Sequence, residues 1–294
     1  MSAFSATEAA FEGFRVARER PWAIVAWAGV AFVFLIGDVI LRTFLIDANA
    51  IQASSRALVA GATPGEQLVH MMAATVPYLA AAVPISLVFY GILFAAAYRV
   101  VLEPISSVNG LRLGIQELRQ VLLILISGLL VFIAYLGVAF LCGLAYVLMR
   151  PLSEPLAAVI GALSVVISYA LLIVLPIRLS LAGPHTFVEH RLRPFASWTM
   201  SRGHFWPMLG AYVFATVFAF VVILLGMAIL AGLFAFAGDT VQRIGATPTN
   251  FVDNLKPLRI VYLVGTSFII AQAWAIIACP AASIFRQLNR EAVP

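Results

Sequence analysis

Six long apolar runs constrain the fold of this chain more than any motif does. Each run is long enough to cross about 30 Å of hydrocarbon at about 1.5 Å per residue. Lipid offers no hydrogen-bond partner to an exposed backbone, so such a run must be helical. The sequence therefore predicts an all-α, polytopic membrane protein with six transmembrane helices. The predicted spans cover about residues 22–46, 72–102, 120–149, 155–182, 206–237 and 258–285.

The composition excludes a soluble domain. Apolar residues make up 63% of the chain and charged residues only 11%, whereas a soluble domain carries about 25% charged residues. So few charges cannot cover a surface that faces water. The apolar runs also lack the strict alternation of polar and apolar residues that is typical of transmembrane β-strands.

An arginine-bearing amphipathic segment precedes every second apolar run. These three lead-in segments cover residues 14–22, 111–120 and 197–206. Aligning Arg18 with Arg202 places Trp22 opposite Trp206, although the middle segment has no aromatic residue. The pattern predicts three hairpins, each preceded by an interfacial amphipathic helix. The alternative is that the positive-inside rule alone would put arginines at these points.

This pattern predicts the organisation of the chain. We expect a cytoplasmic interfacial helix within residues 1–21, a single six-helix membrane domain over 22–286 and a short cytoplasmic tail over 287–294. The corresponding pseudo-repeats cover about residues 5–102, 108–182 and 193–286.

The N-terminal segment has the features of an amphipathic helix. Ser5 and Glu8 have the spacing of a capping box, in which each side chain binds the other residue's free backbone N–H. Phe11 and Phe14 share one face, and charged residues such as Glu12 populate the remainder. We expect this helix to lie flat in the interface, with the chain turning into the bilayer at the proline that follows.

The arginines predict the orientation. Of the 18 Lys and Arg residues, twelve fall on the side that holds both termini and six on the other side. By the positive-inside rule, the N- and C-termini are cytoplasmic. The net charge of +5 is then a topology signal and an attraction to anionic lipid. The chain contains no aromatic-rich basic module of the kind that binds nucleic acid, so we expect no nucleic-acid partner.

The fourth-to-fifth connection resembles a known family. The chain reads Arg-Leu-Ser-Leu-Ala-Gly-Pro over 178–184, then Glu189, then Ser-Trp-Thr-Met-Ser-Arg-Gly-His-Phe-Trp over 197–206. These segments resemble the signature of the bacterial glycerophosphodiester phosphodiesterase membrane domain and its six-helix relatives. The resemblance is specific over about thirty residues and architectural elsewhere. It implies a multi-pass protein of the bacterial inner membrane. Some relatives carry a fused soluble phosphodiesterase domain, which we do not expect in this protein, so the resemblance does not imply their activity.

Two groups of polar residues are candidate sites. Asp38 and Arg42 are four apart in the first span, where an intrahelical ion pair or a proton or ion relay would use them. A basic group around the fourth-to-fifth connection could instead hold a lipid phosphate, because arginine offers planar donors suited to it. The alternative is that these charges only set the topology. The basic group consists of Arg178, Arg191, Arg193 and Arg202.

Other residue types predict anchoring rather than chemistry. Trp22, Trp198 and Trp206 are expected to anchor the protein at the cytoplasmic interface. No two of the four histidines have the spacing of two metal ligands on one helix turn, so we expect neither a metal nor another cofactor. The chain has no nucleotide-binding loop, nucleophile elbow or zinc-protease helix, and we expect no enzymatic activity and no catalytic residues.

Three functions remain open. The first is a non-catalytic inner-membrane module that interacts with lipids, especially anionic ones, or with a protein partner or a second copy of itself. The second is a transporter or permease for an amphiphilic or lipid-like solute, which proline-interrupted helices and internal repetition favour. The third is an intramembrane enzyme that acts on lipid headgroups, which requires acidic, histidine or serine side chains clustered at one depth.

Overall fold

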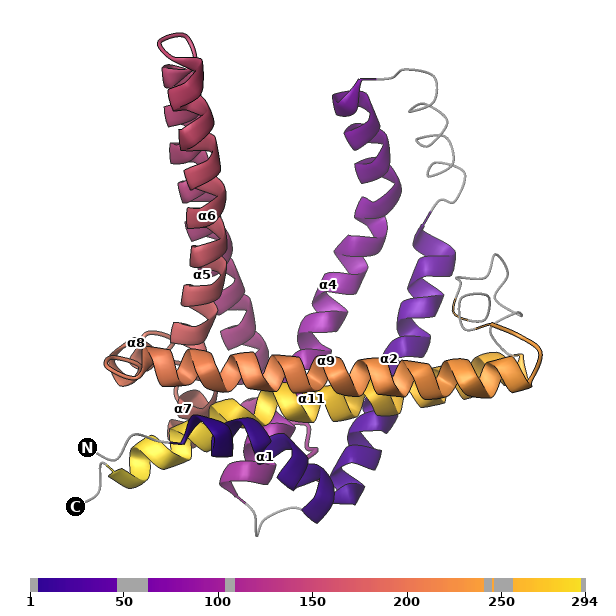
Figure 1. Ribbon diagram of the computed structural model, residues 1–294. Coiled ribbons are helices and arrows are strands. Elements are labelled where there is room, and N and C mark those ends of the chain that lie inside the picture. The colour runs from indigo at the N-terminus through magenta and orange to yellow at the C-terminus, as the bar shows by residue number, and fades with distance from the viewer. Residues whose placement is uncertain (1–4, 47–62, 104–108, 241–244, 246–255, 292–294) are drawn as a thin grey trace.

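A computed structural model describes residues 5–46, 63–103, 109–240, 245 and 256–291 (Figure 1). Within this part of the chain, six helices are long and apolar enough to cross a membrane. This confirms the predicted all-α polytopic fold. The six helices are α2 (Pro21–Leu45), α4 (Pro64–Leu102), α5 (Ile115–Met149), α6 (Glu154–Leu179), α9 (Phe205–Phe236) and α11 (Pro257–Glu291).

Three shorter helices lie at the base of the molecule, namely α1 (Ala6–Glu19), α7 (Ala182–Glu189) and α8 (Ala196–Met200). The six predicted spans agree with the long helices to within a few residues, except that α4 begins at Pro64 rather than near residue 72. The predicted tail over 287–294 also differs, because α11 continues to Glu291.

The long helices form arms that diverge from a common base (Figure 1). The α5–α6 hairpin forms one arm and α2 with α4 forms another, while α9 and α11 run side by side across them. Helix α11 packs against α1, α2 and α4 as well as α9. Its buried face is built from small residues such as Ala271, Ala275 and Ala282, which allow close approach between helices in lipid.

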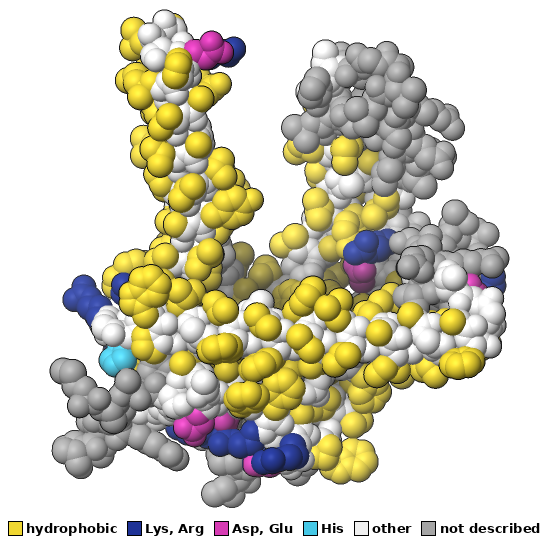
Figure 2. All heavy atoms as spheres, viewed as in Figure 1, with side chains coloured by type: hydrophobic (Ala, Val, Ile, Leu, Met, Phe, Trp, Pro, Cys, Tyr) yellow, Lys and Arg dark blue, Asp and Glu magenta, His cyan; other side chains and the backbone are white. Residues whose placement is uncertain are grey.

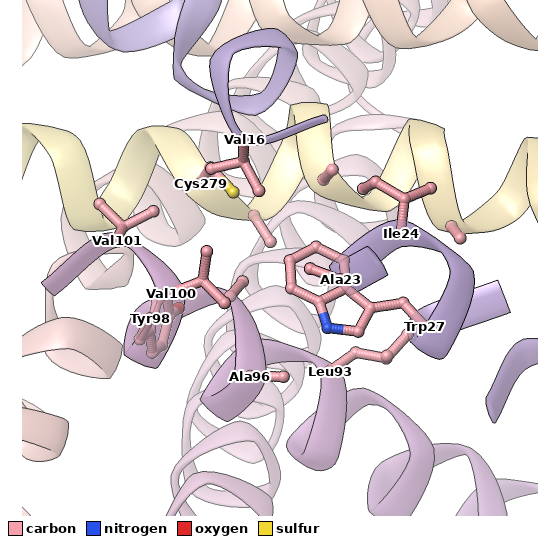
Figure 3. Close-up of a cluster of buried hydrophobic side chains, with 14 of the residues drawn as sticks. Val16, Ala23, Ile24, Trp27, Leu93, Ala96, Tyr98, Val100, Val101 and Cys279 are labelled. Atoms are coloured by element: carbon pink, nitrogen blue, oxygen red, sulfur yellow. The ribbon is translucent and has the colours of Figure 1, made fainter. Parts of the chain in front are cut away.

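A buried cluster around Trp27 contains residues of five helices, α1, α2, α4, α7 and α11, at the base (Figure 3). The indole of Trp27 is fully buried, and Leu93 of α4, Val16 of α1 and Cys279 of α11 belong to the same cluster. The Trp27 Nε1–H donates a hydrogen bond to the Asn109 carbonyl at 2.9 Å. The cluster therefore joins α2 both to the core and to the segment that leads into α5.

Helix α1 docks onto the protein, which corrects part of the interfacial-helix prediction. Glu12 was expected on the polar face but is 2% exposed. It accepts hydrogen bonds from Arg15 and from Arg286 of α11. A Cβ at Gly13 would lie 2.5 Å from the Ala275 carbonyl oxygen. Only a glycine therefore permits this approach to α11, and the charge beside it is paired rather than solvated.

The start of α1 shows half of the predicted capping box. The Ser5 hydroxyl accepts from the Glu8 N–H at 3.2 Å, as predicted. The Ser5 N–H, however, donates to the Gln287 Oε1 at 3.1 Å rather than to Glu8. The end of α11 thus supplies the partner that the capping box would have provided locally.

The middle lead-in segment does not form a separate helix in residues 109–114, because α5 begins only at Ile115. Gly110 has a left-handed φ of +71°, and its carbonyl accepts a hydrogen bond from Arg99. These contacts hold the segment in a non-helical path. The prediction of an interfacial helix before every hairpin is therefore wrong for the second hairpin.

A buried ion pair links α4 to α5 at the base. Arg99 is 2% exposed and Glu117 is 5% exposed. The Arg99 Nη2 lies 2.6 Å from the Glu117 Oε1 and also donates to the Gln116 Oε1 at 3.1 Å. A buried charge without its partner costs far more than the pair contributes.

We expect Glu117→Ala to destabilise the protein by about 3–5 kcal/mol, because it leaves the Arg99 charge buried and unpaired. Thermal denaturation in mild detergent, followed by loss of soluble monomer, measures this change. The double variant Arg99→Met/Glu117→Met should recover much of the loss, because neither charge is then buried. As a control, Arg18→Ala removes only an exposed pair with Glu19 and should leave the transition unchanged. A Glu117→Ala transition equal to that of the control would contradict the assignment.

Candidate functional site

An apolar cavity of about 460 Å³ lies at the base, where the arms meet. Figure 2 shows a V-shaped opening between the α5–α6 arm and the α2–α4 arm above this region. The cavity walls come from all three hairpins and from α7. The lining residues include Phe94 and Tyr98 of α4, Leu123, Ser127, Gly128 and Val131 of α5, Pro176 and Leu179 of α6, Gly183 of α7, Tyr212 of α9 and Ile277 of α11.

A few polar groups are set among these apolar walls. Gln120 lines the cavity, and its Nε2 donates to the Gly183 carbonyl at 3.0 Å. A Cβ at Gly183 would lie 2.5 Å from the Tyr98 hydroxyl oxygen, so this glycine lets Tyr98 lie against α7. The buried Tyr212 hydroxyl forms no hydrogen bond of good geometry with the described residues, and the Ser180 side chain lies near it. A polar group of a ligand in the cavity could bind this hydroxyl.

Arg178, the last basic residue of α6, is held by aromatic rings. Its guanidinium carbon lies 5.1 Å from the ring centroid of Trp198 and 5.6 Å from that of Phe205. Cation–π contacts of this kind stabilise a charge without neutralising it. In the described part of the chain, no carboxylate forms an ion pair with Arg178. Its N–H donors remain able to bind an anion from outside the protein.

The other three arginines of the basic group lie along the connection that follows α6. Arg193 lies 3.5 Å from the Glu189 carboxylate, which also lies 3.3 Å from the His185 Nε2. Arg191 and Arg202 are exposed. The structure thus separates the group by environment. Arg178 lies against aromatic rings, Arg193 is paired with an acid, and Arg191 and Arg202 extend from the surface.

The connection itself is attached to α5. His190 has a left-handed φ of 56° and ends α7, and its Nδ1 lies 3.1 Å from the Gln116 Nε2. A second cavity, of about 570 Å³, is lined by α7, α8 and the end of α11, and it includes His185, Glu189 and His204. Within the described residues, no three His, Cys, Asp or Glu side chains are grouped to hold a metal. The side chain of His70 lies outside that part.

Asp38 and Arg42 form an ion pair within α2, with the Arg42 Nε 2.7 Å from the Asp38 Oδ2. The Tyr78 hydroxyl of α4 donates to the other carboxylate oxygen at 2.6 Å. The Arg42 guanidinium also lies over the Tyr78 ring at 5.1 Å. Both carboxylate oxygens therefore have partners, and the pair joins α2 to α4. Sequence spacing indicated the ion pair but not Tyr78.

The three tryptophans proposed as anchors have different environments. Trp22 and Trp206 lie at the starts of α2 and α9 and are 71% and 76% exposed. Such exposed indoles suit a membrane interface. Trp198 is only partly exposed and lies against Arg178. The interface role suits the first two, whereas Trp198 positions an arginine.

Sequence reasoning did not identify the cavity. Its lining residues are widely separated in sequence and carry no motif. The weak signal was the presence of tyrosines within apolar runs, which Tyr98 and Tyr212 exemplify.

Comparison with known proteins adds no assignment, since no family model, no curated protein and no solved structure matches the chain. The resemblance to the glycerophosphodiester phosphodiesterase membrane domain stays a prediction.

We expect Asp38→Asn to destabilise the protein by about 1–3 kcal/mol, because it removes the charge that Arg42 pairs with and weakens the bond to Tyr78. Thermal denaturation in detergent measures the loss. The matched variant Tyr78→Phe removes one hydrogen bond and keeps the ion pair, so its loss should be smaller, at about 0.5–1.5 kcal/mol. A larger loss for Tyr78→Phe than for Asp38→Asn would contradict a structural role centred on the carboxylate.

Proposed function

We propose that this protein is a non-catalytic module of the bacterial inner membrane that binds an anionic phospholipid from the cytoplasmic leaflet. In this proposal an acyl chain occupies the cavity of about 460 Å³ and the phosphate binds Arg178. The observation that carries the proposal is an apolar cavity that opens between membrane helices, beside an arginine whose described partners are aromatic rings rather than a carboxylate.

The volume and the lining of the cavity suit the acyl chain of the proposed lipid. Its volume is within the range of about 300–1,000 Å³ that small-molecule sites occupy. The described lining residues include no Asp, Glu or His, so the cavity favours a hydrocarbon chain and offers no acid–base pair for hydrolysis. This favours binding over the intramembrane-enzyme alternative.

The end of α6 suits the phosphate headgroup of the proposed lipid. Leu179 and Ser180 line the cavity and follow Arg178 directly, so a phosphate at Arg178 would lie within the length of one lipid molecule from the cavity. Arginine binds phosphate through two parallel N–H donors. The exposed Arg191 and Arg202 add positive charge to the same connection. Cytoplasmic termini, as the positive-inside rule predicts, would put this edge at the anionic leaflet.

Transport of an amphiphile is the second candidate. Pro176 lies inside α6 and also lines the cavity. A proline removes a backbone donor and permits a bend there. Movement of the α5–α6 arm about this point would change the cavity opening. A transporter predicts lipid movement between leaflets, whereas a binding module predicts retention only.

We expect Arg178→Ala to lower the amount of anionic phospholipid retained by the purified protein about tenfold, because a charged hydrogen-bond donor to the phosphate is lost. Native mass spectrometry after extraction in mild detergent measures retained lipid. Arg178→Lys should retain an intermediate amount, because lysine keeps the charge and loses the planar pair of donors. Arg150→Ala, at the exposed end of the α5–α6 hairpin, is the matched control and should retain wild-type amounts. Equal retention by Arg178→Ala and the control would overturn the headgroup assignment.

We expect Gly128→Phe to abolish lipid retention by filling the cavity. Gly128 lines the cavity, and a Cβ there meets nothing within 4 Å, so the helix backbone can accept a side chain. Gly137→Phe is the control on the same helix, because Gly137 is equally open and lies outside the cavity lining. The readout is the same mass spectrum, with the thermal transition as a check on folding. If both phenylalanine variants retain lipid equally, the acyl chain does not occupy the cavity.

A further inference from the structure

The α5–α6 arm contacts the rest of the chain less than the other long helices do. Each long helix contains an apolar stretch of 18 residues. In α6 none of the residues of this stretch is buried, and in α5 6% are buried, whereas 22–33% are buried in α2, α4 and α11. Figure 2 shows this arm extending away from the remainder of the protein. Lipid alone would suit an arm that is apolar all round.

The arm is not apolar all round, because one side has a groove of about 490 Å³ that is rich in hydroxyl groups. Both helices contribute to it. Its polar lining consists of Tyr135, Cys142 and Tyr146 of α5 and Ser164, Ser168 and Tyr169 of α6.

The hydroxyl groups of this groove retain unsatisfied hydrogen-bond donors and acceptors. Ser164 and Ser168 each donate to a carbonyl of their own helix at 2.7 Å, so their oxygens remain as acceptors. Among the described residues, the Tyr135 and Tyr169 hydroxyls have no hydrogen-bond partner. Spare tyrosine donors and spare serine acceptors thus occur in the same groove.

The depth of Tyr169 in the membrane differs from that of an interfacial aromatic belt. Tyr169 lies nine residues before Arg178 on one helix, which is about 13 Å along the axis. If Arg178 lies at the cytoplasmic interface, Tyr169 and its neighbour Ser168 are then inside the hydrocarbon, whereas belts of tyrosine lie at the interfaces. Hydrocarbon offers these hydroxyls no partner.

We propose that the α5–α6 groove is a homodimer interface, in which it pairs with the same groove of a second copy of the chain. All copies share one orientation in the membrane, so a twofold axis along the membrane normal brings residues of equal depth together. Tyrosine donors of one copy then meet serine acceptors of the other. The contact is self-complementary and closed, and it satisfies groups that lipid leaves unsatisfied.

Cys142 offers a direct test, because it lines the groove and is a free thiol. The full-length protein is reconstituted in phospholipid vesicles and treated with a short thiol-reactive cross-linker. We expect a cross-linked dimer for the wild type and for Cys279→Ser, because Cys279 is buried. Cys142→Ser should give no dimer. Absence of a wild-type dimer would overturn the proposal and indicate that lipid covers the groove.

A matched variant separates a specific contact from random collision. Leu141 is next to Cys142 on α5, is 64% exposed and lies outside the groove lining. Leu141→Cys in the Cys142→Ser background should therefore cross-link poorly, although its thiol is accessible. Cross-linking at both positions with equal yield would mean collision and would overturn the proposal.

The hydroxyl pairing has its own test. Tyr135→Phe/Tyr169→Phe keeps both rings and removes both donors, and should lower the dimer association constant roughly tenfold. The association constant comes from the dimer fraction in vesicles at decreasing protein density. Tyr90→Phe, on α4 outside the groove, should leave it unchanged. An unchanged constant in the double variant would exclude hydroxyl pairing as the basis of the interface.

Discussion

The buried ion pair between Arg99 and Glu117 is the contact on which the base of this protein depends. Arg99 pairs with Glu117 of α5 and also lies over the ring of Phe187 in α7, at 5.5 Å. One guanidinium therefore joins α4, α5 and α7. In lipid, apolar helices gain little from packing against each other rather than against acyl chains. Polar contacts at the base thus determine where the three hairpins converge.

A second ion pair at the base repeats this arrangement. Arg286 of α11 binds Glu12 of α1 and the Val101 carbonyl at the end of α4. Farther from the base such polar contacts between the arms are fewer, and the arms diverge toward the opposite end (Figure 1). Divergence leaves an apolar cavity at the base and a largely lipid-exposed α5–α6 arm. The proposed lipid site and the proposed dimer groove both follow from this one geometry.

The features that sequence could predict are local ones. Run length and hydropathy predicted the six long helices, and a spacing of four placed Asp38 beside Arg42. The features that it could not predict depend on residues far apart in the chain. Glu12 resembled a solvated residue of an amphipathic helix, because nothing nearby indicates that Arg286 lies against it. The cavity was missed for the same reason, since its walls come from six helices.

The arginines near the ends of α4, α6 and α11 offer the clearest link from fold to function. Arg99 and Arg286 each bind a carboxylate and a backbone carbonyl. Arg178 has two aromatic rings in the corresponding place, because the segment that follows it supplies Trp198 and Phe205. Aromatic rings orient a guanidinium without neutralising it. An anionic headgroup would supply to Arg178 the negative charge that Glu117 and Glu12 supply to the other two, which is why the lipid site is proposed at the end of α6.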